Sequence, residues 1–139
     1  MILVPTYVGP SPIEGVGVFA AAPIRQGTRI WVLDETFDRV LSDADIERLG
    51  DEQRAFVERY GYPHTTKPGL TILELDNGRF MNHTSEPNTD FSNPEFGIVI
   101  RDIAEGEEIT CDYEQFAPGS EMLPGRRFVG NGSGTTLAA

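Results

Sequence analysis

The sequence predicts a mainly β domain with one short helical region. Short runs rich in β-branched and aromatic residues alternate with turn signals that contain Gly, Pro, Asn and Asp. Helical spacing of apolar residues is clear only between residues 42 and 61. The length of 139 residues fits one ordinary domain, and 39% hydrophobic residues suffice for a core.

Six runs are expected to form strands. Pro5 marks an edge position in the first of them, because proline cannot donate a hydrogen bond to a neighbouring strand. The segment 25–28, with Gly27, predicts a tight turn, and Asp76-Asn77-Gly78 is a strong turn signal. The expected strands span residues 2–8, 18–20, 29–33, 70–75, 96–100 and 109–113.

Residues 42–61 are expected to form two helices. Ser42 can cap the first helix, and Gly50 can end it in a left-handed conformation. Asp51 can then cap the second helix, which Gly61 ends. The residues spaced to bury one stripe of the second helix are Phe56, Val57 and Tyr60.

The charge balance limits the classes of partner. Lysine and arginine number 11 against 22 acidic residues, which gives a net charge of −11. A nucleic-acid-binding protein would need a basic face for the phosphates, so this class is disfavoured. The acidity suits a basic, lysine-rich protein partner, or it serves solubility alone.

The single cysteine and the short apolar runs limit the disulfides, metal clusters and membrane spans that the chain can form. Cys111 is the only cysteine, so neither an internal disulfide nor a cysteine zinc cluster can form. His64 has no second ligand nearby in the sequence and is expected at the surface rather than at a metal ion. No apolar run approaches the ~20 residues of a membrane span. The opening residues 1–5 lack the basic segment of a signal peptide, so a cytoplasmic location is expected.

Three polar or glycine-rich stretches stand out. Residues 79–88 place Asn82 and His83 directly behind an apolar pair, where unpaired polar groups would be costly. On residue types alone this could be a hydrogen-bonded corner without a ligand. Residues 15–17 hold two glycines, which fit either a backbone close to a bound molecule or a plain hairpin. The third stretch is 105–113, which runs from an acidic turn into the last strand.

In this order, the three stretches resemble the GxG, RFINHSCxPN and GEELxYDY motifs of the SET-domain protein-lysine methyltransferases. The resemblance runs from about Gly15 to Phe116 and departs at Met81 and at Thr84-Ser85, where the family usually has Ser-Cys. It implies a SET fold of small β-sheets around a pseudoknot. The SET domain would span residues 1–117, with a helical insert at about 42–61 and a short, flexible tail at 118–139.

The resemblance implies S-adenosylmethionine as the cofactor. The backbone around Gly15, Val16 and Gly17 would meet the methionine portion of the cofactor. Asn82 would bind the same portion through its amide, and the main chain at His83 would pair with the adenine edge.

By the same resemblance, Tyr113 is the catalytic tyrosine. Its hydroxyl would orient the methyl group and interact with charge near the sulfur, although a core tyrosine at a strand end is the plain alternative. Phe116 or Phe128 could stack on the adenine, or Phe128 could belong to a tail that only touches the core.

The substrate channel departs from the family pattern. Cys111 and Thr71 stand where the family usually has aromatic channel walls, and Tyr60 or Tyr62 could compensate. Aromatic walls stabilise a cation by roughly 1–2 kcal/mol, so a looser channel predicts multiple methylation or an unusual acceptor.

Three functions remain open at this point. The leading one is transfer of a methyl group to a lysine of a basic protein substrate, without nucleic acid or membrane as partner. The second is a weak or inactive SET-fold module that binds cofactor or a basic peptide. The third is a small β domain for assembly with chance motif similarity. A homodimer could complete the cofactor pocket.

Overall fold

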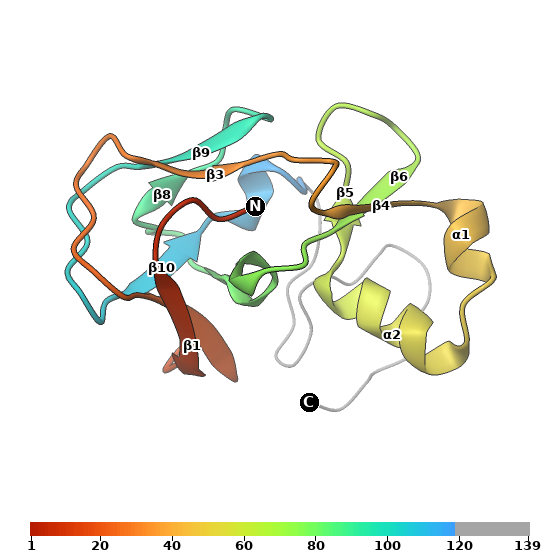
Figure 1. The fold of residues 1–139 in the computed structure, drawn as a ribbon, viewed down its shortest axis with the longest axis horizontal. Helices are drawn as coiled ribbons and strands as arrows, with labels where there is room; N and C mark the ends of the chain where they lie inside the picture. Colours follow the sequence, from red (N-terminus) through yellow and green to blue (C-terminus); the bar gives the residue numbers. More distant parts are fainter. Residues whose placement is uncertain (119–139) are drawn as a thin grey trace.

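The computed structural model describes residues 1–118, in which most strands lie at one end and a helical segment lies at the other, next to one small β-sheet (Figure 1). This agrees with the predicted mainly β class. The elements are β1 (Thr6–Pro10), β2 (Val16–Ala20), β3 (Arg29–Val32), β4 (Arg39–Ser42), α1 (Asp43–Glu47), α2 (Asp51–Tyr60), β5 (Tyr62–Pro63), β6 (Leu70–Leu73), η1 (Asn77–Phe80), β7 (Asn82–His83), β8 (Thr89–Asp90), β9 (Phe96–Val99), β10 (Glu108–Cys111) and η2 (Tyr113–Gln115).

The strands form three small sheets, with the orders β1-β2-β10-β7, β3-β9-β8 and β4-β6-β5. The first sheet determines where the three motifs meet, because β10 lies between β2 and β7. It pairs antiparallel with β2 and parallel with β7, with Thr110 opposite Asn82 and Cys111 opposite His83. Segments about 30 and 90 residues apart in the chain therefore become neighbours.

Asn88 holds β10 in this position. Its Oδ1 accepts a hydrogen bond from the backbone N–H of Thr110 at 2.9 Å, and its Nδ2 donates to the carbonyl of Glu108 at 2.8 Å. The neighbouring Thr89 hydroxyl donates to the carbonyl of Thr110 at 2.7 Å. Asn88 and Thr89 are almost completely buried, so these bonds are shielded from water.

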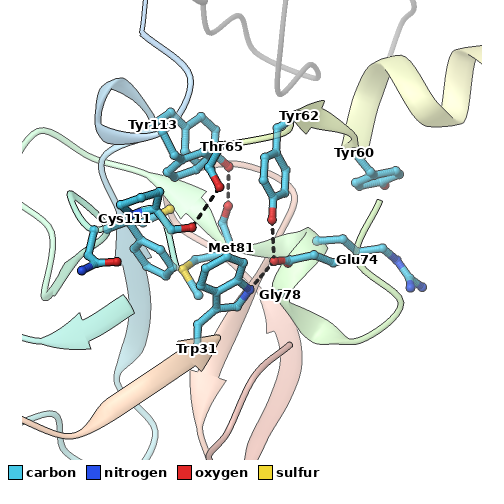
Figure 2. A pocket seen from close by; sticks show the side chains of 14 residues that line it. Trp31, Tyr60, Tyr62, Thr65, Glu74, Gly78, Met81, Cys111 and Tyr113 are labelled. Atoms are coloured by element: carbon cyan, nitrogen blue, oxygen red, sulfur yellow. Dashed lines mark hydrogen bonds between the residues drawn. The ribbon is translucent and has the colours of Figure 1, made fainter. Parts of the chain in front are cut away.

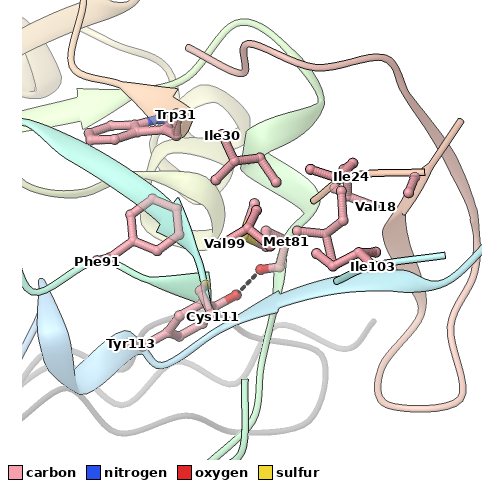
Figure 3. Packing of buried hydrophobic residues seen from close by; sticks show 12 residues of the cluster. Val18, Ile24, Ile30, Trp31, Met81, Phe91, Val99, Ile103, Cys111 and Tyr113 are labelled. Atoms are coloured by element: carbon pink, nitrogen blue, oxygen red, sulfur yellow. Dashed lines mark hydrogen bonds between the residues drawn. The ribbon is translucent and has the colours of Figure 1, made fainter. Parts of the chain in front are cut away.

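A single apolar cluster joins the first two sheets (Figure 3). It draws residues from β2, β3, β9 and β10 and from the loops between them. Burial of this apolar surface is the main stabilising contribution to the fold. The members are Val18, Ala20, Ile24, Ile30, Trp31, Met81, Phe91, Val99, Ile103, Ile109, Cys111 and Tyr113.

The helical insert is confirmed, with differences at its caps. Ser42 caps α1 in a capping box with Asp45, as expected. Gly50 is not a left-handed cap; it is extended (φ −69°) and is itself the N-cap of α2, which displaces Asp51 into the first turn. Gly61 follows α2 as predicted. Val57 is buried, but Phe56 remains 44% exposed, so the predicted apolar stripe is only partly used.

Strand bounds and one turn differ from the predictions, and the last predicted strand ends at Cys111, before Tyr113. The first strand begins at Thr6, because Ile2 forms only an isolated bridge to Trp31. The turn at residues 76–78 is a 3₁₀ helix, capped by the Asp76 carboxylate on the N–H of Gly78. Among the described residues, no helix has both the length and the apolar character that crossing a bilayer requires.

We predict that Asn88→Ala lowers the free energy of unfolding by about 2–4 kcal/mol, because it leaves the buried N–H of Thr110 and carbonyl of Glu108 without partners. Urea denaturation would measure the change. The exposed Asn93, replaced in the same way, is the control and should change stability by less than about 1 kcal/mol. Equal losses in the two variants would contradict the assignment.

Candidate functional site

The three motifs meet at the side chain of Asn82. Its Nδ2 donates to the carbonyls of Glu14 at 3.1 Å and Val16 at 3.0 Å. The same nitrogen lies 3.0 Å from Oε1 of Glu108, which also accepts a hydrogen bond from the Ser11 hydroxyl at 2.8 Å. One amide therefore joins the glycine segment, β7 and β10.

The glycines of the first motif have different roles. A Cβ at Gly17 would lie 2.1 Å from Oε1 of Glu108 and 3.1 Å from Nδ2 of Asn82, so only glycine fits under the amide. Gly15 has a positive φ of 44°, which side chains rarely adopt, and no atom lies within 4 Å of its ideal Cβ. The backbone at Gly15 therefore borders open space.

His83 supports the start of η2. The backbone N–H of Tyr113 donates to its Nδ1 at 3.0 Å, and the two rings lie 5.2 Å apart. Its strand, β7, is the last strand in its sheet. An edge strand has main-chain groups that no neighbouring strand pairs, so the main chain at His83 can receive a ligand.

Tyr113 lies at the boundary between this region and a cavity. Its side chain is nearly buried, and its hydroxyl donates to the carbonyl of Met81, the residue before Asn82 (Figure 2). The predicted catalytic residue therefore contacts His83 and the residue that precedes Asn82. Phe116 packs beside Tyr113, with ring centroids 5.5 Å apart, and beside Tyr62 at 5.3 Å.

About 550 Å³ of empty space lies in the cavity and in the solvent at its mouth, so the enclosed part is smaller. Its walls are largely aromatic, with sulfur atoms from Met81 and Cys111. Of the predicted channel residues, Tyr60, Tyr62 and Cys111 line it. Thr71 does not; it pairs with Pro63 within the third sheet. The predicted role of Phe128 lies outside the described residues.

Glu74 is the residue of this cavity that the sequence analysis missed. It directly follows β6, and its Oε1 accepts hydrogen bonds from the Trp31 indole and, at 3.0 Å, from the Tyr62 hydroxyl (Figure 2). Burial raises the pKa of the Glu74 carboxyl, and the nearby Asp76 adds to the effect. Burial, together with Glu74, raises the pKa of the Tyr62 phenol. An acidic residue at the end of an apolar run was the available signal.

His64 corrects the prediction of a surface histidine. It is only 7% exposed, and its Nε2 lies 2.7 Å from Glu35. Its Nδ1 accepts from the backbone N–H groups of Thr66 and Lys67, at 3.1 and 3.0 Å. The ring therefore organises the loop after β5. Within residues 1–118, no group of three potential metal ligands comes together.

Comparison with known proteins supports this reading of the motifs. The profile of the SET domain matches residues 15–114. The chain belongs to the SET-domain family. That match includes every element from the glycine segment to Tyr113 and ends one residue beyond it.

Solved structures show the same fold. A candidate histone methyltransferase of Plasmodium falciparum, PFL0690c, superposes on this SET domain with a TM-score of 0.55 and 22% identity, covering 81% of this chain and 95% of that one. Chaetomium thermophilum Polycomb Repressive Complex 2, in an autoinhibited state, gives a TM-score of 0.61 and 21% identity. There the alignment covers 84% of this chain but only 16% of the other. A search of curated proteins finds no match.

We predict that Gly17→Ala destabilises the SET domain by about 1–3 kcal/mol, because the added methyl group would displace the Glu108 carboxylate from Asn82. Gly9→Ala is a matched control, since Gly9 pairs with Gly17 across β1 and β2 and its Cβ would be at an ordinary 3.6 Å from Phe19. Chemical denaturation measures both. Equal stability of the two variants would show that the space under the amide is not restrictive.

We also predict a pH-dependent difference between wild type and Glu74→Gln. Because burial raises the pKa of the folded-state carboxyl, unfolded chains ionise first as the pH rises above the ordinary value of 4.5. The wild type therefore loses stability relative to the glutamine variant over that rise, while glutamine can still accept both hydrogen bonds. Denaturation of both proteins between pH 4 and 8 measures the difference, and a constant difference would contradict the raised pKa.

Proposed function

We propose that this chain is an S-adenosylmethionine-dependent methyltransferase that acts on a lysine side chain of a protein substrate. The observation that carries the proposal is the contact between the Tyr113 hydroxyl and the carbonyl of Met81. This contact joins a cavity suited to a long side chain to Met81. The residue after Met81 is Asn82, which begins β7 and binds the glycine segment.

The residues present fit the cofactor. The Nδ2 of Asn82 is engaged by backbone carbonyls, and within the described chain its Oδ1 accepts no hydrogen bond, so it can accept one from the methionine ammonium. Gly15 borders open space, and the edge of β7 offers main-chain groups at His83. Phe116 offers an aromatic face for adenine. When bound, S-adenosylmethionine supplies a methyl group made reactive by a sulfonium.

The chain's own residues would position and desolvate the acceptor. A lysine amine, with an ordinary pKa of about 10.4, is protonated at neutral pH and has no lone pair for attack. Apolar walls around the cavity lower the pKa of an entering amine. The Tyr113 hydroxyl is fixed by a main-chain carbonyl, so it can align the reacting groups without moving.

The charge of the chain supports a basic protein as substrate. A net charge of −11 attracts a lysine-rich segment over long range and disfavours nucleic acid. The similar Plasmodium protein is named as a histone methyltransferase, but its 22% identity supports no choice of particular substrate here. Assembly as a homodimer remains a prediction from the sequence.

We predict that calorimetry detects binding of S-adenosylmethionine to the full chain. Asn82→Ala should weaken that binding by about tenfold or more, because a hydrogen bond to a charged group is lost. Tyr113→Phe should bind the cofactor but transfer radiolabelled methyl groups to a lysine-rich protein at least about tenfold more slowly.

Tyr7→Phe is the control for loss of a phenolic hydroxyl, since Tyr7 is exposed and does not line the cavity. Thermal unfolding without cofactor would separate misfolding from lost binding. Cofactor binding without any transfer would favour the inactive binding module, and absence of binding would remove the proposal.

A further inference from the structure

The cavity contains a buried carboxylate without an ion pair of its own; the N-terminal ammonium is near enough to lower its pKa but is bound to Asp38 at 3.1 Å. Glu74 is only 6% exposed, and within residues 1–118 it forms no ion pair. Glutamate is rarely buried unless a positive charge compensates it. The one basic residue of the cavity wall, Arg79, is directed elsewhere: its guanidinium donates to the carbonyl of Leu75 and lies 4.6 Å from the Phe80 ring.

The two oxygens of Glu74 have different surroundings. Both hydrogen bonds that the carboxylate accepts, from Trp31 and Tyr62, end on Oε1. In the described part of the chain, Oε2 accepts none. It packs against Gly78, where a Cβ would come within 2.2 Å of it, so only glycine leaves room for the carboxylate here. Glu74 and Gly78 both line the cavity.

The walls around this carboxylate suit a cation on an apolar stem. Trp31 and Tyr62 hold the carboxylate through their polar ends, and Tyr60 and Phe91 add aromatic surface to the cavity. Aromatic faces attract cations, and a charge-assisted hydrogen bond to a carboxylate is about twice as strong as a neutral one. A primary ammonium on a four-carbon chain satisfies both features.

We propose that Glu74 is the group that binds the ammonium of the entering substrate in this cavity, through Oε2, and thereby selects a charged primary amine. A carboxylate favours the protonated amine, so this binding precedes loss of the proton and transfer of the methyl group. Assigning the amine to a substrate lysine rests on the proposed function, but the cation site itself does not. The purely structural alternative is that Glu74 only accepts hydrogen bonds from Trp31 and Tyr62.

The fluorescence of Trp31 can measure the binding of an amine at Glu74. Trp31 is the only tryptophan of the chain, and its indole N–H is bound to Glu74, so its fluorescence reports on this carboxylate. The full chain is titrated with n-butylammonium chloride, which reproduces the end of a lysine side chain, at ionic strength held constant with sodium chloride. The uncharged 1-butanol, with the same number of heavy atoms, is the matched ligand.

We expect a saturable change with n-butylammonium and at least about tenfold weaker binding of 1-butanol. Glu74→Gln should weaken n-butylammonium binding at least about tenfold, since glutamine keeps an acceptor for Trp31 and Tyr62 but lacks the charge. Glu52→Gln, which removes an exposed carboxylate on α2, should bind as the wild type does.

Equal binding by wild type and Glu74→Gln, equal binding of amine and alcohol, or no binding by the wild type would each overturn the cation site. Other results would contradict the proposed function. Glu74-dependent amine binding without any cofactor binding would keep the cation site and remove the methyltransferase. Methyl transfer that Glu74→Gln leaves unchanged would keep the methyltransferase and remove the assignment of the cation site to the substrate lysine.

Discussion

The position of β10 between β2 and β7 is the constraint on which the site depends. Only this placement brings Glu108 to Asn82 and Tyr113 to Met81, because these residues lie 26 and 32 positions apart in the chain. A four-residue strand makes few hydrogen bonds of its own, so Asn88 and Thr89 supply side-chain bonds to its backbone. The polar motif therefore stabilises the fold and forms the site with neighbouring residues: Asn88 binds the strand while Asn82 faces the glycine segment.

Local sequence signals predicted the parts of the fold that local interactions determine. The cap at Ser42 and the turn at Gly27, with a φ of 85°, needed only nearby residues and were correct. The burial of His64 was not predictable in this way, because its partner Glu35 is 29 residues away. The prediction for Gly50 was wrong for a different reason. Glycine fits either end of a helix, and in the short loop between α1 and α2 Gly50 caps the start of α2.

The site was predictable where a motif contributes to it and not elsewhere. Asn82, His83 and Tyr113 were predicted from motifs that occur in the family's order along the chain, and the structure brings their segments together. Glu74 belongs to no motif that the sequence displayed, and its environment is made by Trp31 and Tyr62, from two other strands. Thr71 shows the opposite limit. Its position was inferred from the family pattern, but its side chain lies beside Gly61 and does not line the cavity.

Two polar groups of the cavity wall, the Tyr113 hydroxyl and the Glu74 carboxylate, are fixed by different kinds of partner. The Tyr113 hydroxyl is bound to a main-chain carbonyl, which no substitution of Met81 can remove. Glu74 is bound only by side chains, so replacing Trp31 or Tyr62 changes its hydrogen bonding directly. Under the proposed function, substitution of Trp31 or Tyr62 would alter the group that binds the amine and leave the Tyr113 hydroxyl in place. Amine selection would then vary within one SET scaffold without a change at Tyr113.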